Sequence, residues 1–165
     1  MREHIGLYRG KRVGNGEWVQ GYLYEHEPPL QCFVPEGYVP EKSKWYILKT
    51  AFADWNMPRQ VEFIEVDPDT VGECCGGLTD KNGKLAFEHD VTEDQWGRLW
   101  IIFGCKGGFG ICRDTEWTRN ADCSVITWNA LAAARNAEWF SKQHEIIGNI
   151  HDNPELLGGG DESHA

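Results

Sequence analysis

The sequence predicts a mainly β fold of the α+β class, built from hairpins, with one alanine-rich helix and a short C-terminal helix. The 165 residues include 19 glycines and 8 tryptophans, and short apolar runs alternate with turn residues along most of the chain. Hydrophobic residues make up 41% of the chain and aromatic residues 12%, which indicates a packed core rather than disorder. A chain of this length buries enough surface for one core.

The first elements expected are strands joined by tight turns. Residues 5–24 are typical of a hairpin around Gly14-Asn15-Gly16, and the aromatic residues at positions 18, 22 and 24 share one strand face. Residues 25–44 carry four prolines and are interpreted as a linker-like insertion, with 31–34 as a short edge strand. Residues 45–49 and 61–66 are strand candidates, after which Asp67-Pro68-Asp69 turns the chain.

The segment from 71 to 91 is dominated by turn residues. Asn82-Gly83 predicts a hairpin with a two-residue type I′ turn, because that turn needs a positive φ at both central positions. The apolar run at 98–105 is expected to be buried on both faces or to lie at the centre of a barrel wall. Residues 106–108 are expected to form the turn of a third hairpin, which joins this run to a strand at 109–113.

Helical signals appear near the C-terminus. Residues 128–141 lack glycine and proline and are rich in alanine, which predicts a helix. Residues 145–150 are expected to form a closing strand, and Asp152-Asn153-Pro154 predicts a short terminal helix with an Asx cap. We therefore divide the chain into an N-terminal region 1–66, a second region 67–157 that includes the helix, and a flexible tail 158–165.

Charge is spread unevenly along the chain. The formal net charge is −10, and residues 60–97 contain ten acidic residues against two lysines. Such a stretch repels phosphate backbones and attracts basic surfaces, so we do not expect duplex nucleic acid as a partner. A solvated acidic face that keeps the protein soluble is one interpretation, and a docking face for a basic partner or a nucleic-acid mimic is the other.

Targeting signals are not evident in this sequence. We find no apolar run of the length that crosses a bilayer and no signal-peptide pattern after the charged N-terminus. The expected compartment is therefore the cytoplasm in which the chain is made, where its six cysteines are thiols.

Three blocks of the sequence together resemble the YopX family, small proteins encoded by phages and prophages. They are residues 9–23, residues 66–91 with Gly77-Leu78-Thr79-Asp80-Lys81-Asn82-Gly83-Lys84 at their centre, and residues 147–157. The resemblance implies a mainly β fold with a small, partly open, barrel-like core. It also implies a phage or prophage setting in a bacterial host, and no catalytic residue.

Two departures from the family pattern lie in the middle block. Glu73-Cys74-Cys75 with an extra glycine stands where members have a Gln-Tyr-Thr type sequence, and His89 stands where members have the glycine of a Glu-Gly-Asp. If that glycine has a positive φ, a histidine there is strained or forces another turn.

Sequence motifs for catalysis or metal binding are weak in this chain. The cysteines include no Cys-x-x-Cys, so Cys74 and Cys75 are interpreted as buried thiols rather than a metal site. On a strand, the ring in Glu88-His89-Asp90 points away from both carboxylates, which favours turn and cap roles over acid–base catalysis. We expect no enzyme activity, no metal and no cofactor.

The candidate binding residues combine acidic, aromatic and basic side chains. Our first hypothesis is a non-enzymatic accessory protein that binds a host or phage protein through the acidic stretch and nearby aromatics, as an inhibitor of host defence or regulation. The alternative is a small nucleotide or single-stranded nucleic acid bound by exposed aromatics and arginines. Self-association stays open. The residues chosen are Glu65, Asp67, Asp69, Trp96, Trp117, Arg98 and Arg113.

Overall fold

The computed structural model describes residues 6–28, 33, 37–39, 41–50, 60–105, 108–113 and 134–157. Its contacts divide the chain into two compact units, Gly6–Val71 and Gly72–Ala165 together with Met1–Ile5. The described residues form two antiparallel sheets and one α-helix. The mainly β prediction is therefore confirmed.

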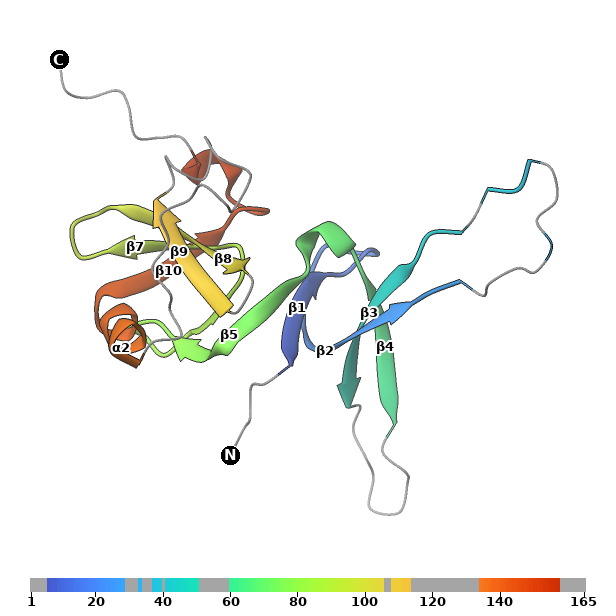
Figure 1. Cartoon of the computed structure of the whole chain (residues 1–165), viewed down its shortest axis with the longest axis horizontal. Coiled ribbons are helices and arrows are strands. Elements are labelled where there is room, and N and C mark those ends of the chain that lie inside the picture. Colours follow the sequence, from blue (N-terminus) through green and yellow to red (C-terminus); the bar gives the residue numbers. More distant parts are fainter. Residues whose placement is uncertain are drawn as a thin grey trace. The chain divides into compact units, whose positions relative to one another are not determined.

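Four antiparallel strands make up the first unit, in the order β4-β3-β2-β1 (Figure 1). They are β1 (Leu7–Lys11), β2 (Trp18–His26), β3 (Lys44–Thr50) and β4 (Val61–Val66). These strands confirm the predicted first hairpin and both later strands. The predicted edge strand at 31–34 lies outside the described residues, except for the exposed Phe33.

One face of this sheet carries the core of the first unit, and the sheet curls around it. The core residues are Val19, Ile47, Ile64 and Val66. An isolated bridge between Arg12 and Val66 joins the ends of the two outer strands. At Gly21 a Cβ would stand 2.2 Å from the carbonyl oxygen of Leu48, so only glycine lets β2 and β3 approach this closely.

A short 3-10 helix, η1 (Pro68–Thr70), follows β4. The Asp67 carboxylate accepts a hydrogen bond from the Asp69 amide at 3.1 Å, which caps this turn. The buried Thr70 hydroxyl accepts one from the Lys11 amide at 2.9 Å and so ties the turn to β1. The turn predicted at 67–69 is confirmed.

The hairpin of β5 (Gly72–Thr79) and β6 (Leu85–Phe87) opens the second unit. The predicted two-residue type I′ turn is wrong, because Gly83 has a positive φ and Asn82 does not. Asp80 and Lys84 instead close a three-residue loop, and the Asp80 carboxylate accepts from the amides of Asn82 and Lys84, both at 2.9 Å. These bonds favour a type I turn followed by a left-handed glycine.

The second of the two sheets lies in this unit and has the order β10-β7-β8-β9. Its strands are β7 (Asp90–Asp94), β8 (Leu99–Cys105), β9 (Gly108–Arg113) and β10 (His144–Asn149). Ile101 and Phe103 of β8 belong to one hydrophobic cluster and Ile102 to another. The central strand is therefore buried on both faces, as its apolar run predicts.

The helix α2 spans Ala134–Gln143. It confirms the part of the predicted helix that begins at 134, while positions 128–133 lie outside the described residues. The C-terminal helix is a single 3-10 turn, η2 (Pro154–Leu156), and the predicted Asx cap is wrong, since Asn153 makes no side-chain cap bond. The Asn153 side chain instead contacts the Asn149 amide and the Glu155 carboxylate.

The predicted barrel is not confirmed. The two sheets of the described residues are not closed into a barrel. Strands β5 and β6 nevertheless share one hydrophobic cluster with the second sheet and α2, whose buried members are Cys75, Ala86, Ile102, Ile111, Phe140 and Ile146.

Candidate functional site

Alternating arginine and tryptophan side chains form a cluster on the second unit. We call Trp96, Arg98, Trp100 and Arg113 the arginine–tryptophan cluster. The Arg98 guanidinium carbon lies 4.4 Å from the ring centre of Trp96 and 5.7 Å from that of Trp100, and the Arg113 carbon lies 5.5 Å from Trp100. Strand pairing places Trp100 opposite Arg113. Trp96, in the turn before β8, is 61% exposed.

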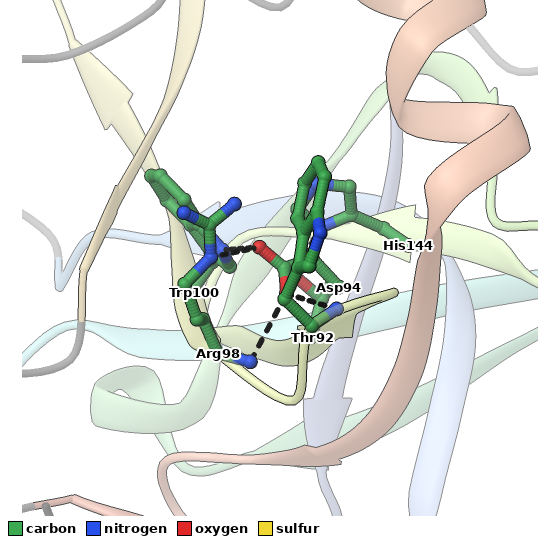
Figure 2. A network of polar contacts seen from close by, with 6 residues as sticks. Thr92, Asp94, Arg98, Trp100 and His144 are labelled. Carbon is green, nitrogen blue, oxygen red and sulfur yellow. Dashed lines mark hydrogen bonds and ion pairs between the residues drawn. The ribbon is translucent and has the colours of Figure 1, made fainter.

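A buried carboxylate holds this cluster in place (Figure 2). Asp94 Oδ1 accepts from the amides of Trp96 and Arg98 at 2.9 and 3.0 Å, and Oδ2 accepts from Arg98 Nε at 2.7 Å and Trp100 Nε1 at 3.0 Å. Burial opposes ionisation of Asp94, but these hydrogen bonds outweigh it and lower its pKa to about 2. The carboxylate is therefore charged at neutral pH and fixes Arg98.

A neutral histidine lies among the aromatic rings beside Asp94. His144 is fully buried, its ring stacks on Phe140 with centres 4.9 Å apart, and Nδ1 lies 3.0 Å from the Thr92 hydroxyl. Trp139 and Trp100 meet the ring edge to face. Burial lowers the pKa of His144 to about 4, so the ring is uncharged at pH 7. Nε2 has no hydrogen-bond partner among the described residues.

A second aromatic surface lies on the outer face of the first unit's sheet. We call Tyr22, Tyr24, Tyr46, Phe63 and Glu65 the aromatic sheet face. Tyr22, Tyr24 and Phe63 are 62%, 44% and 56% exposed. Tyr24 pairs with Tyr46 across β2 and β3, and Tyr46 pairs with Glu65 across β3 and β4, so these side chains share one face.

The structure brings together part of the predicted site. Trp96, Arg98 and Arg113 meet around Trp100. The three acidic residues belong to the other unit: Glu65 lies on the aromatic sheet face, and Asp67 and Asp69 stand at the turn of η1. Trp117 lies outside the described residues.

Sequence reasoning missed two kinds of residue. Asp94 appears in the sequence only as one more acid of the 60–97 stretch, yet it is the acceptor on which the cluster depends. The sequence places Tyr46 and Phe63 on strands, but the sheet face that they share with Tyr22 and Tyr24 emerges only through the cross-strand register. The parity of the aromatic residues at 18, 22 and 24 was the available signal.

The unusual segment of the middle block has structural roles. Cys74 and Cys75 are buried thiols, as expected. Asp90 accepts from the Phe87 amide and Glu88 from the Glu73 amide, both at 2.9 Å. These contacts fit the turn and cap roles expected of Glu88 and Asp90.

His89 has a positive φ, the first of the two alternatives that the family glycine raises for this position. Its φ is 68°, in the left-handed region that glycine occupies at low cost. The His89 amide donates to the Ile102 carbonyl at 2.8 Å, and its carbonyl accepts from Ile150 at 3.0 Å. Its Nδ1 lies 3.2 Å from Nε2 of His151. The backbone bonds on both sides hold the residue in this conformation.

Metal and membrane features are absent from the described part of the chain. Among those residues, no three histidine, cysteine, aspartate or glutamate side chains are grouped as metal ligands would be. Within the same residues, no helix has the length and apolar character needed to cross a membrane.

Comparison with known proteins identifies the family. Residues 39–158 match the family model described as YopX protein, which is more than half of the chain. The match includes the middle and C-terminal blocks of the resemblance and begins after the first. A search of curated proteins finds no match.

Proposed function

This chain belongs to the YopX protein family, and we propose that it is a non-enzymatic phage or prophage accessory protein that binds a host or phage protein in the bacterial cytoplasm. The family name states no activity. The observation that carries the proposal is the aromatic sheet face, on which Tyr22, Tyr24 and Phe63 are exposed beside Glu65. Inhibition of a host defence or regulatory factor is the role that fits such a protein best.

Exposed aromatic side chains on a sheet are suited to a protein interface. Tyrosine presents a large, rigid contact area and loses little rotamer entropy when it is covered. Residues of this kind dominate the binding energy of many interfaces. Because Tyr22, Tyr24 and Phe63 lie outside the core of their unit, the fold does not need them buried.

Partner capture from infected host cells tests this function. We expect the tagged wild-type chain to retain a protein that the double variant Tyr24→Ser, Phe63→Ser loses, and that binds again when both purified proteins are mixed. The control is Trp96→Ser, which removes a more exposed ring from the other unit. A partner retained equally by the double variant would contradict this assignment, and a second copy of the chain as the retained protein would indicate self-association.

A second candidate function rests on the arginine–tryptophan cluster. Nucleobases stack on tryptophan, and arginine adds cation–π and phosphate contacts. Arg98 and Arg113 flank Trp100 here, and Trp96 is open to solvent. This arrangement favours a small nucleotide or a single strand. A partly open barrel, proposed from the hydrophobic cluster that β5 and β6 share with the second sheet, would carry the ligand on its wall.

Thermal-shift and anisotropy measurements test the second candidate. Mononucleotides or a single-stranded oligonucleotide should stabilise the wild-type chain by mass action, and Trp96→Ala or Arg113→Gln should weaken binding by about fivefold or more. The variant Phe63→Ala is the control. Unchanged nucleotide binding in both cluster variants would exclude the arginine–tryptophan cluster as the binding site.

A further inference from the structure

Three aromatic rings on neighbouring strands line a shallow, open groove on the aromatic sheet face. Tyr24 of β2, Tyr46 of β3 and Phe63 of β4 line it together with His26, and its volume is about 380 Å³. Figure 1 shows the three strands side by side. The ring centres of Tyr24 and Phe63 are 6.0 Å apart, and those of Tyr46 and Phe63 are 6.3 Å apart.

The rings meet at steep angles rather than lying flat. The planes of Tyr24 and Phe63 cross at 85°, and those of Tyr46 and Phe63 at 77°. A nucleobase needs a flat ring face on which to stack. Crossed rings instead line a small, open space, and the negative electrostatic potential at an aromatic ring face attracts a compact cation. The groove therefore suits an ammonium group better than a base.

A carboxylate stands next to this groove. Glu65 is directly opposite Tyr46 in the pairing of β3 with β4, which places their Cβ atoms about 5 Å apart. Glu65 is exposed, so its side chain is able to approach a cation held by the rings. Lys44 lies on the same face opposite His26 and is a diagonal neighbour of Glu65, at the end of the groove away from Phe63.

We propose that this groove, the cation cage, takes the side chain of a lysine on a basic protein partner. The inference rests on the proposed protein-binding function and names the chemistry of the partner. The lysine ammonium lies against the faces of Tyr24, Tyr46 and Phe63, and Glu65 supplies the opposite charge. The same cage accepts a trimethylated lysine, because cation–π attraction does not need an N–H donor.

Short peptides test the cage on the full chain. The probes are acetyl-Gly-Lys-Gly-amide, its trimethyl-lysine form and the norleucine form, which keeps the aliphatic chain but lacks the charge. Aromatic NMR resonances of Tyr24, Tyr46 and Phe63 report binding. We expect both cationic peptides to shift them and the norleucine peptide to bind about fivefold more weakly.

Two variants localise the effect. Phe63→Leu keeps an apolar side chain but removes a ring face, and Glu65→Gln removes the negative charge. Each variant should bind the lysine peptide about threefold more weakly, or weaker still. Ile147→Ala, which removes an exposed apolar side chain on the other unit, should change nothing. Norleucine binding equal to lysine binding, or unchanged affinity in Phe63→Leu, would overturn the cage.

The outcome separates the cage from the proposed function. If the double variant Tyr24→Ser, Phe63→Ser loses its partner while no lysine peptide binds, the protein-binding function stands and the cage fails. If the lysine peptide binds but the partner is retained by that double variant, the cage stands and the proposed interface fails.

Discussion

The aromatic sheet face and the arginine–tryptophan cluster are both exposed and aromatic, but they are built in different ways. In the cluster, every polar group of Asp94 is engaged, and Arg98 is fixed between two rings. The sheet face has no buried polar anchor among its described residues, and its rings meet one another and the His26 ring. A cluster held by a buried charge is rigid, whereas a face of exposed rings adapts to what covers it.

The difference also shows where each surface is vulnerable. The cluster depends on buried hydrogen bonds, whose loss leaves unsatisfied polar groups. The sheet face depends on the close approach of strands that Gly21 permits. Mutations at these two kinds of position should therefore damage one surface and spare the other.

The largest expected effect is that of Asp94→Ala. It leaves Arg98, Trp100 Nε1 and two backbone amides without their acceptor, and should lower the free energy of unfolding by about 4 kcal/mol. Urea titration followed by tryptophan fluorescence measures this. Glu65→Ala, an exposed carboxylate on the sheet face, should stay within about 0.5 kcal/mol. Equal losses in the two variants would remove the distinction between the surfaces.

Acidification should weaken the second unit in two steps. The folded pKa of His144 is lowered to about 4 from 6.5, so the unfolded chain binds the proton first. The contribution of His144 to the free energy of unfolding is fully present above pH 6.5 and falls by about 3 kcal/mol towards pH 4. The Asp94 pKa is about 2 against 3.8, and its contribution is lost as the pH falls from 3.8 to 2.

The variant His144→Phe isolates the first step. Unfolding free energies measured between pH 7 and pH 4 should depend less on pH in this variant than in the wild-type chain, because the buried titratable ring is gone. A pH dependence identical to that of the wild-type chain would show that other groups cause the acid sensitivity.

Gly21→Ala tests the sheet face. A Cβ at this position would stand 2.2 Å from the Leu48 carbonyl oxygen, and we expect a loss of about 2 kcal/mol. Hydrogen exchange read by mass spectrometry should show the loss in β2 and β3. Gly14→Ala is the matched control, since no atom lies within 4 Å of its Cβ. Exchange that accelerates equally in both variants would argue against the close strand approach.

The smallest effects are expected for the exposed rings themselves. Phe63→Ser and Trp96→Ser should each change the unfolding free energy by about 0.5 kcal/mol or less, because both rings are more than half exposed. Thermal unfolding measures both. A large loss in either variant would mean that the ring serves stability rather than recognition.

Local sequence signals predicted the strands well and the turns less well. Alternation in 61–66 and the apolar run at 98–105 identify β4 and β8. Asn82-Gly83 marks the right hairpin but the wrong turn, because the Asp80 side chain bonds to the loop amides and selects a type I turn. The glycine that other family members have at position 89 leaves two alternatives, a positive φ or another turn, and His89 has the positive φ.

The candidate site was only partly visible in the sequence. Trp96, Arg98 and Arg113 were chosen as separate candidates, and the strand pairing that places Trp100 against Arg113 unites them. Asp94 and its acidic neighbours look alike in the sequence, yet Asp94 is buried and Glu93 is half-buried. Burial is a property of the folded sheet, so net charge along the chain could not distinguish them.

The sequence by itself determined the fold class, the family and the positions of most strands, because these follow from period-two alternation, turn residues and local motifs. The tertiary structure alone decided which side chains meet. Tyr24, Tyr46 and Phe63 are far apart in the chain and form one groove through strand register. Asp94 becomes the anchor of the cluster only when packing removes it from water, since a buried carboxylate must find hydrogen-bond donors.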